Sequence, residues 1–376
     1  MNFDFTEEQA LLRASVERWC AARHGGDIAG ALRRLRAAGG GFPREGWQAL
    51  AGLGLLALPF AVADGGLGGG PVETVAVLEP LGRALAPEPV SECLMMAGTL
   101  LAEAAGPGAR AAALAPVIAG ETLLSAAITE QRGRTNIGHA ETRARAAGAG
   151  WVLSGAKSAV WQGGAADAFL VTARTHGEAR AREGVGLFLV PRSAPGVEVR
   201  PWRAADGSLA AELGLRDVAL GPEARLEGAA DTLPAIEAAL ARAWLAASAE
   251  MLGIAGLLLE TVLAHVKTRH QFGRPLGAFQ VIQHRLTDCH VAVEQARSMV
   301  YRAALAPADG FHRAATGAHA YVSEAARHVA HEAVQLHGGM GVTDELLVGH
   351  GLKRIQLLSR LWTSPDESLL AWARAA

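Results

Sequence analysis

A short stretch in the last third of the chain carries side chains that suit a phosphorylated ligand with a flat ring. Residues 268–280 hold a permanent cation, Arg269, two amides, Gln271 and Gln280, and an aromatic ring, Phe272. A guanidinium binds anionic oxygens in pairs, an aromatic face stacks on a base, and amides reach the edges of a ring. From these residues alone two interpretations are equally good: a ligand-binding turn, or a plain turn between two helices.

Two long helices must position this stretch. Apolar residues recur at helical spacing before it and resume after it, while Gly273 and Pro275 interrupt the pattern between them. From about residue 231 the chain is predicted to be helical to its end, and the number and length of its helices suit a four-helix bundle. The four predicted helices are 233–267, 279–305, 311–337 and 345–361.

The first 230 residues divide into a helical part and a β-rich part. Residues 1–120 have helical texture, with a capping box at Thr6–Gln9 and a glycine connector at 64–70 that lacks the spacing and the preceding strand of a phosphate loop. Residues 121–230 contain short β-rich runs that favour a compact antiparallel sandwich or barrel. Because strands and helices do not alternate, a Rossmann fold is disfavoured. The predicted strands are 123–129, 151–154, 168–173, 185–190, 197–202 and 212–218.

Three charged residues in these parts are interpreted as structural. Glu73 and Glu79 lie in a helical pattern and are expected on its solvated face. Lys157 lies in a β-rich run and is expected at a strand edge, where it would hold a turn. Charged side chains are rarely fully buried unless they are paired, so no chemistry is assigned to these three.

Composition narrows the possible classes of protein. A chain of 376 residues is expected to form two or three domains. Its formal net charge of −2 gives no sign of a nucleic-acid or anionic-membrane surface, and no apolar run reaches the roughly 20 residues of a membrane-spanning helix. Cys20, Cys93 and Cys289 are widely spaced, so neither a disulfide framework nor a metal site is expected. With no secretory signal visible, a cytoplasmic protein is predicted.

In residue type and spacing, the 268–280 stretch resembles the Arg-x-Gln-Phe-Gly…Phe-Gln signature of the acyl-CoA dehydrogenase family. Further segments extend the similarity from Phe3 to the last helix. Residues 78–85 resemble the family's Glu-x-Leu-Gly-Arg stretch, and residues 127–130 resemble the start of its flavin-contacting Leu-Thr-Glu segment. Residues 155–163 resemble Gly-x-Lys-x-x-Ile-x-x-Gly, and residues 335–341 resemble Gln-x-x-Gly-Gly-x-Gly. The resemblance implies the family's fold, mainly α with a central β domain. That fold has an N-terminal helical domain over 1–120, an antiparallel β-barrel or sandwich over 121–230, and a C-terminal four-helix bundle over 231–376.

The resemblance also implies an activity. Family members are tetramers that bind FAD between subunits, remove an α-proton and a β-hydride from an acyl-CoA thioester, and are reoxidised by electron-transfer flavoprotein. This chain would then use FAD and an acyl-CoA substrate in a homo- or heterotetramer. Carried over residue by residue, Arg269 would meet the FAD pyrophosphate of the neighbouring subunit, Phe272 would pack on the adenine side, Thr129 would hydrogen-bond the isoalloxazine, and Thr135 would replace the usual pyrophosphate serine. The other implied contacts are Trp161, Gln271, Gln280, Gln335, Gly338 and Gly339.

The similarity breaks at the catalytic base. The α-proton of a thioester is weakly acidic, so its removal needs a carboxylate in a dry pocket. Counting from the glycine-rich segment, the family's glutamate position falls on Trp362, and an alternative family position falls on Ala243. Asp366 and Glu367 are the acids nearest to Trp362; they would need a one- or two-residue bulge, and they also suit the first turn of a final helix. Glu250 is a weaker candidate on the helix of Ala243.

The flavin segment departs too. Residues 131–136 replace the family's Pro-x-x-Gly-Ser-Asp, and Trp161 takes the place of a flavin-contacting threonine, where it would either stack near the flavin or exclude it.

Three explanations fit these departures: a displaced acid is the base, the chain is half of an α2β2 assembly whose partner supplies the glutamate, or the scaffold binds a nucleotide or CoA and catalyses nothing. The second is favoured because 335–345 is typical of a branch that includes small subunits of pimeloyl-type and steroid side-chain dehydrogenases. We therefore predict FAD-dependent α,β-dehydrogenation of an acyl-CoA by the atypical subunit of a hetero-oligomer, with a catalytically inactive partner subunit as the alternative.

Overall fold

The computed structural model describes residues 4–226 and 232–374, which fold as two compact units. Each unit joins segments that lie far apart in the sequence. The two units interleave along the chain and therefore do not test the boundaries of the three consecutive domains expected from the sequence, which stay a prediction. The helical unit comprises Met1–Gly39, Pro71–Pro87 and Trp244–Ala376, and the sheet unit comprises Gly40–Gly70 and Glu88–Ala243.

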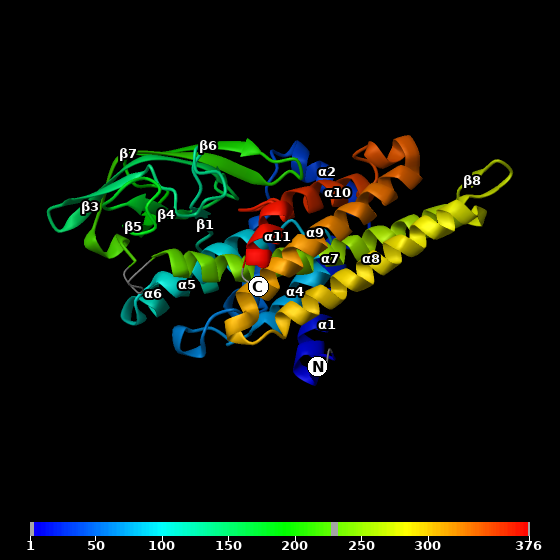
Figure 1. Ribbon diagram of the computed structural model, residues 1–376, viewed down its shortest axis with the longest axis horizontal. Helices are drawn as coiled ribbons and strands as arrows, with labels where there is room; N and C mark the ends of the chain where they lie inside the picture. The colour runs from blue at the N-terminus through cyan, green and yellow to red at the C-terminus, as the bar shows by residue number, and fades with distance from the viewer. Residues whose placement is uncertain (1–3, 227–231, 375–376) are drawn as a thin grey trace. The chain divides into compact units, whose positions relative to one another are not determined.

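Long helices make up the helical unit. α1 begins with the predicted capping box, in which the Thr6 side chain accepts from the backbone of Gln9 and the Gln9 side chain accepts from the backbone of Thr6. α8 and α9 pack side by side along their lengths (Figure 1). The bounds are α1 Glu7–His24, α2 Ile28–Ala37, α4 Pro71–Arg83, α7 Thr232–Thr268 (which begins in the sheet unit), α8 Gln280–Ala304, α9 Ala308–His337, α10 Leu347–Leu358 and α11 Pro365–Arg374.

The four helices predicted after residue 230 are present as α7 to α10, and α11 is the final helix whose first turn Asp366 and Glu367 were expected to suit. A local capping box starts it. The hydroxyl and the backbone N–H of Ser364 each donate to the Glu367 carboxylate at 2.9 Å, and the N–H of Glu367 donates to the Ser364 hydroxyl at 3.3 Å. Pro365 at the first helical position has no N–H to satisfy, so a short helix begins where apolar periodicity alone gives little signal.

Two glycines bring α4 and α7 into backbone contact within the helical unit. A Cβ on Gly82 would lie 2.1 Å from the carbonyl oxygen of Glu250, and a Cβ on Gly253 would lie 2.0 Å from the carbonyl oxygen of Glu79. Both distances are far below van der Waals contact, so a side chain at either position would force the helices apart.

Glu79 corrects one expectation from the sequence. It is not on a solvated face: only 5 % of the residue is exposed. Its carboxylate accepts from Arg13 of α1 at 2.7 Å and from Arg297 of α8 at 2.6 Å, and the hydroxyl of Tyr301 donates to it at 3.3 Å. Burial raises the pKa of Glu79, but the hydrogen bonds and charges of the two arginines outweigh burial and lower it. The carboxylate thus joins three helices.

A curled sheet forms the core of the sheet unit. Its described strands run in the order β1-β4-β2-β3-β7-β6, with β5 paired to β4. The pairings of β1 and of β2 with β4 are parallel, which the antiparallel expectation did not include. The strands are β1 Leu124–Ala127, β2 Arg143–Ala147, β3 Gly150–Val160, β4 Ala168–Arg174, β5 Val185–Pro191, β6 Val197–Arg203 and β7 Leu209–Leu220. The helices of this unit are α3 Arg44–Gly52, a π-helix at Val90–Gly98, α5 Thr99–Ala104 and α6 Pro107–Ile118.

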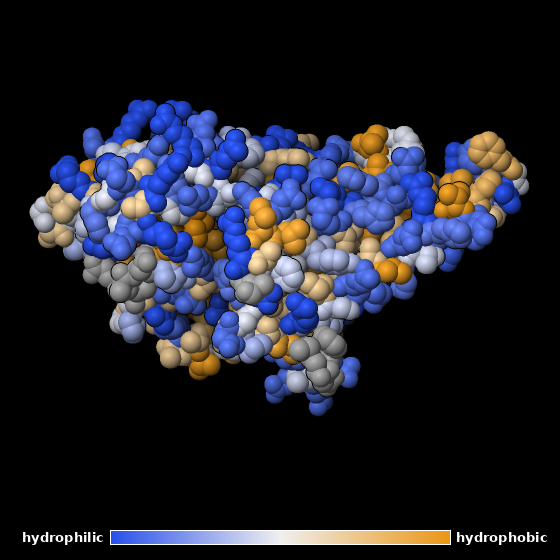
Figure 2. Space-filling model, in the orientation of Figure 1, coloured by the Kyte–Doolittle hydropathy of each residue, from blue (hydrophilic) through white to orange (hydrophobic). Residues whose placement is uncertain are grey.

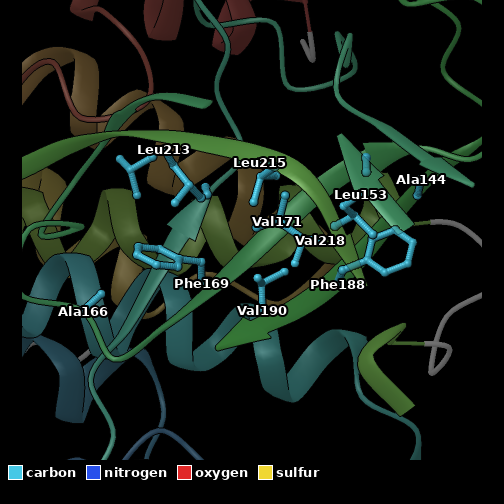
Figure 3. Close-up of a cluster of buried hydrophobic side chains, with 13 residues drawn as sticks. Ala144, Leu153, Ala166, Phe169, Val171, Phe188, Val190, Leu213, Leu215 and Val218 are labelled. Atoms are coloured by element: carbon cyan, nitrogen blue, oxygen red, sulfur yellow. The ribbon is translucent and has the colours of Figure 1, made fainter. Parts of the chain in front are cut away.

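The concave side of the sheet is filled by apolar side chains from facing strands (Figure 3). Phe169 and Val171 of β4 lie among Leu213 and Leu215 of β7, and Phe188 of β5 lies beside Leu153 of β3. Each of them is at most 3 % exposed. Burying such side chains contributes about 1.5–3 kcal/mol apiece, so this core holds the strands that carry the candidate site residues.

α7 is long and apolar enough to pass a length-and-composition test for a membrane span, but 78 % of the tested window is buried inside the protein. That degree of burial is typical of the core helix of a soluble protein.

Candidate functional site

The predicted ligand-binding turn is a β-hairpin, β8 (His270–Gln271) and β9 (Arg274–Pro275), between α7 and α8. Phe272 and Gly273 form its two-residue turn with positive φ angles of 52° and 79°, the signs of a type I′ turn. A phenylalanine with positive φ is strained, and here 91 % of it is exposed. Figure 2 shows a hydrophobic patch at this hairpin, at the right of the view. The fold therefore presents a strained, exposed aromatic ring, which points to a role in binding.

Arg269 lies at the start of this hairpin, and its carbonyl accepts from the backbone of Leu276 at 2.8 Å. Its side chain is exposed and forms no ion pair with any residue in the described ranges. Gln271 and Gln280 are also exposed. The hairpin thus brings together the cation, the ring and the amides that the sequence predicted.

The glycine-rich segment after α9 lies at the same end of the helical unit. The rings of His265, near the end of α7, and His337, the last residue of α9, stack with centroids 4.1 Å apart. Gln335 is exposed in the last turn, and Gly338 ends the helix with φ 66°. A Cβ on Gly338 or on Gly339 would meet nothing within 4 Å, so open space lies above this backbone.

In the sheet unit, two hydrogen bonds between Thr129 and Ser158 connect the residues that follow β1 to strand β3. The Thr129 hydroxyl donates to the Ser158 carbonyl at 2.6 Å, and the Ser158 N–H donates to the Thr129 carbonyl at 3.0 Å. Trp161 is half-buried, with its ring edge-on to Trp202 at 5.9 Å. Thr135 lies further along, half-buried in the turn that follows Glu130.

Gln162, beside Trp161, is a polar residue that sequence reasoning missed. It is 3 % exposed, with φ 61°, and its side-chain oxygen has no hydrogen-bond partner among the described residues. A buried acceptor without a donor costs about 1–3 kcal/mol, so a ligand that brings an N–H group would stabilise it. Nothing in the sequence signals this, because glutamine is usually exposed.

Lys157 and Glu130 form a buried ion pair directly behind this segment. Lys157 is 1 % exposed, and its ammonium donates to Glu130 at 2.7 Å and to the Thr172 hydroxyl at 2.9 Å. The expectation of a strand-edge lysine without a chemical partner is wrong, because the side chain is buried and its ammonium is paired with Glu130, while β3 pairs at this position with Leu213 of β7. Burial lowers the pKa of Lys157 to about 8, although Glu130 opposes the shift. The Glu130 carboxylate also accepts from the backbone of Glu141 and of Thr142 at 2.6 and 3.0 Å, so the pair holds the 131–142 loop.

The two positions where the family places its base are apolar and buried. Trp362 is 5 % exposed, with φ 62°, and its indole nitrogen has no partner in the described part of the chain. Ala243 is fully buried. Next to it, Trp244 is 8 % exposed and packs against the rings of His312 and His319 at 5.8 and 6.2 Å.

The three candidate acids differ in their surroundings. Asp366 is exposed and lines an apolar cavity of about 290 Å³ between α8, α9 and α11. Glu367 is exposed, and its carboxylate caps α11 through Ser364. Glu250 is 6 % exposed and accepts from Arg354 of α10 at 2.7 Å. Of the three acids, Asp366 alone lines this cavity.

The side chains of the hairpin and the backbone of the glycine-rich segment fit the adenosine and pyrophosphate half of a flavin dinucleotide. The hairpin offers a cation without an ion-pair partner and an exposed ring, and the glycine-rich segment leaves its backbone open, which suits a pyrophosphate and an adenosine. In the sheet unit, the orphaned oxygen of Gln162 suits a ring with an N–H group.

Comparisons with known proteins identify the family along nearly the whole chain. Models of the N-terminal, middle and C-terminal domains of acyl-CoA dehydrogenase match residues 6–121, 125–218 and 233–363. A probable acyl-CoA dehydrogenase of Mycobacterium tuberculosis, FadE25, is 31 % identical over 82 % of this chain and 80 % of its own length. A probable acyl-CoA dehydrogenase of Bacillus subtilis, YngJ, is 29 % identical over 95 % of each chain. The crystal structure of the ChsE4–ChsE5 complex from Mycobacterium tuberculosis contains a chain with a TM-score of 0.86 and 28 % identity, covering 100 % of this chain and 98 % of that one.

These matches confirm the predicted three-part fold, with helical N- and C-terminal parts around a curled sheet. The family comprises FAD-dependent oxidoreductases of fatty acid and steroid metabolism. The chain belongs to the acyl-CoA dehydrogenase family.

Proposed function

We propose that this chain takes part in the FAD-dependent α,β-dehydrogenation of an acyl-CoA thioester as the atypical subunit of a hetero-oligomer. One observation carries the proposal: a buried tryptophan, Trp362, stands where the family pattern places the catalytic glutamate. An indole cannot accept the α-proton, so the carboxylate must come from elsewhere. A partner subunit of the same family, with a glutamate at its own position, supplies it.

Each part of this chain has a role in that reaction. The hairpin of Arg269 and Phe272 would hold the pyrophosphate and adenine side of the neighbouring subunit's FAD, helped by Gln271 and Gln280, and the backbone at Gly338 and Gly339 would approach the adenosine beside Gln335. Thr129 and Trp161 would face the isoalloxazine, and Thr135 would lie at the pyrophosphate in place of the usual serine.

When bound, FAD would supply the acceptor for the β-hydride; the α-proton would pass to a carboxylate, and electron-transfer flavoprotein would receive the two electrons. The buried indole of Trp362 would exclude water from the part of the active site where the family's glutamate would lie.

Relatives support a paired assembly. A solved relative at 28 % identity is described as a complex of two named proteins, ChsE4 and ChsE5. By likeness to it, we propose that this chain joins a second family member in a heterotetramer that acts in the cytoplasm.

The test starts with the purified chain alone. Its visible absorbance gives the flavin content per chain, and anaerobic addition of acyl-CoA thioesters of several chain lengths shows whether the flavin is bleached. The proposal predicts no bleaching by the lone chain and bleaching after coexpression with a glutamate-bearing companion. Bleaching by the lone chain would contradict the proposal and direct attention to Asp366, which lines a cavity, before Glu367, whose carboxylate caps α11.

A second candidate is a catalytically inactive partner that binds no flavin. The buried Trp362 and the half-buried Trp161 favour it if they fill the flavin site. A chain that takes up no FAD even in excess, and whose companion is equally active without it, would establish this alternative.

A further inference from the structure

The sheet unit contains a cavity of about 650 Å³ whose charged lining is cationic. Arg143, Arg145, Arg174, His176 and Arg225 line it, and none of its described lining residues is an aspartate or a glutamate. Sites for small molecules have volumes of roughly 300–1,000 Å³. None of the residues assigned above to FAD lines this cavity.

The cavity exists because two strands diverge. β2 pairs with β4 at a single position, Arg143 with Arg174, and then continues with β3 alone as far as Ala147 opposite Gly150. β4 stays with β5, which it pairs with up to Arg174 opposite Val185. The space between the free edge of β2 and the end of β4 is therefore not closed by a strand.

An aromatic stack forms one side of the cavity. The Trp151 ring packs edge-on against Phe188 of the sheet core, with centroids 5.4 Å apart. The Arg225 guanidinium lies over the Trp151 ring, 5.0 Å from its centroid. A further planar group can continue such a stack, because guanidinium planes and aromatic rings both stack on bases.

Two of the arginines that line the cavity, Arg143 and Arg145, are not neutralised by a described carboxylate. Arg174 donates to the carbonyl oxygens of Gly138, Ala179 and Ala181, each at 2.9 Å, which fixes its position. Burial and the charge of the nearby Arg143 lower the pKa of Arg174, and Glu130 opposes the shift. Arg143 and Arg145 are exposed on β2 and form no ion pair within residues 4–226 and 232–374.

Like charges gathered in a concave site repel one another and attract an anion. We propose that this cavity binds a nucleoside phosphate across the free edge of β2, with its phosphate oxygens on Arg143 and Arg145 at one face of the sheet and its base stacked on the Arg225–Trp151 pair at the other. Guanidinium groups match phosphate oxygens in a bidentate way, and stacking supplies affinity for the base.

Two sources have this chemistry: a free nucleotide, or the nucleotide end of a CoA thioester. Trp151 precedes Ser158 by seven positions on β3, roughly 20 Å at the rise of an extended strand, so the aromatic side of the cavity is remote from the Thr129–Ser158 contact.

The test is calorimetric titration of ADP into the full chain in excess FAD, so that the flavin's own adenosine site is filled. Because each lost charge-assisted contact is worth more than 1 kcal/mol, we expect Arg143→Gln/Arg145→Gln to raise the Kd for ADP about tenfold or more. Arg216→Gln is the matched control: this exposed arginine of β7 pairs with Glu198 outside the cavity and should leave the Kd unchanged. Arg143→Lys/Arg145→Lys keeps the charge and should retain most of the affinity, and adenosine should bind far more weakly than ADP.

Competition identifies the source. Displacement of ADP by CoA, with the same loss in the glutamine double variant, assigns the cavity to the nucleotide end of a CoA thioester. ADP binding that CoA does not displace assigns it to a free nucleotide. The proposal is overturned if wild-type protein with excess FAD binds no ADP, or if the glutamine and control variants bind ADP equally well.

Discussion

The ammonium of Lys157 lies 2.7 Å from the carboxylate of Glu130, and both groups are almost fully buried. They belong to β3 and to the residue after Thr129, so this pair joins the two segments whose backbones meet at Thr129 and Ser158. The candidate flavin-facing threonine is therefore positioned by an ion pair that is almost fully shielded from solvent.

Removing one member of this pair should be costly. Lys157→Met leaves the Glu130 carboxylate buried without its cation, which typically costs about 3–5 kcal/mol. Urea unfolding at pH 7 should show this loss, and Glu130→Gln/Lys157→Met should lose much less than the sum of the two single variants. Arg182→Ala, which breaks an exposed pair with Glu237, should cost about 1 kcal/mol or less. Additive effects of the two buried substitutions would contradict a coupled pair.

Glu79 should make the protein sensitive to acid. Its pKa is lowered in the folded state, so the unfolded chain takes up a proton at a higher pH than the folded one. The stabilisation is present above the unfolded pKa of about 4.5 and is lost as the pH falls through the folded value. Glu79→Gln should cost about 3–5 kcal/mol at pH 7 and flatten the fall in unfolding free energy at low pH. An equally steep fall in this variant would count against the assignment.

His319 should contribute a second pH dependence, at higher pH. It is fully buried, its ring lies 3.0 Å from the Ser368 hydroxyl, and burial lowers its pKa to about 4. The unfolded chain binds a proton below pH 6.5 while the folded ring stays neutral, so acid favours unfolding between pH 6.5 and 4, by roughly 3 kcal/mol in total. His319→Gln should remove this slope. His290→Gln, at an exposed position on α8, should keep it, and parallel curves for both variants would exclude the effect.

Trp362 should be a packing residue. Trp362→Ala removes a buried indole and should cost about 3–5 kcal/mol in urea unfolding. Trp202→Ala is the control, because that residue is 37 % exposed and should cost about 1 kcal/mol or less. Equal costs for the two variants would show that Trp362 is not held by its surroundings. Trp362→Glu tests the family alignment: flavin bleaching by acyl-CoA in this variant would place the glutamate position at residue 362.

Arg269 should matter for flavin and not for stability. Its side chain is exposed and forms no ion pair with described residues, so Arg269→Ala should change the unfolding free energy by less than about 0.5 kcal/mol. Loss of a charge-assisted contact to a pyrophosphate should weaken FAD retention about tenfold or more. Lys267→Ala, exposed two residues away, is the control for nonspecific charge effects. Unchanged flavin content in the Arg269 variant would remove this residue from the site.

Periodic apolar residues were enough to predict α7 to α9 and most strands, because these elements bury one regular face. β2 was missed, since its buried positions include only the small Ala144 and its exposed positions carry arginines, a combination with little β propensity. The two parallel pairings were missed as well, because pairing direction is a long-range property that no local pattern contains.

The parts of the candidate site that lie within one short segment could be predicted from the sequence, and the parts formed by residues from distant segments could not. Residue types and spacing predicted a turn at 268–280 and left ligand binding and a plain connection equally good, and the family resemblance then favoured binding. The cavity at Arg143 and Arg174 was not predicted, because 31 positions separate two residues that pair across strands. Glu79 and Lys157 were misplaced for the same reason: their partners come from distant segments, and a charge alone does not show that a partner exists.

The close backbone approaches at Gly82 and Gly253 have a consequence for Glu79. The atom that a side chain at position 253 would strike is the carbonyl oxygen of Glu79 itself. Any residue larger than glycine there would displace the Glu79 backbone, and the carboxylate that Arg297 of α8 contacts at 2.6 Å would have to adjust with it. Two residues without side chains thus set how closely α4 approaches α7, and a single added methyl group would disturb the ion pairs of Glu79 together with the helix packing.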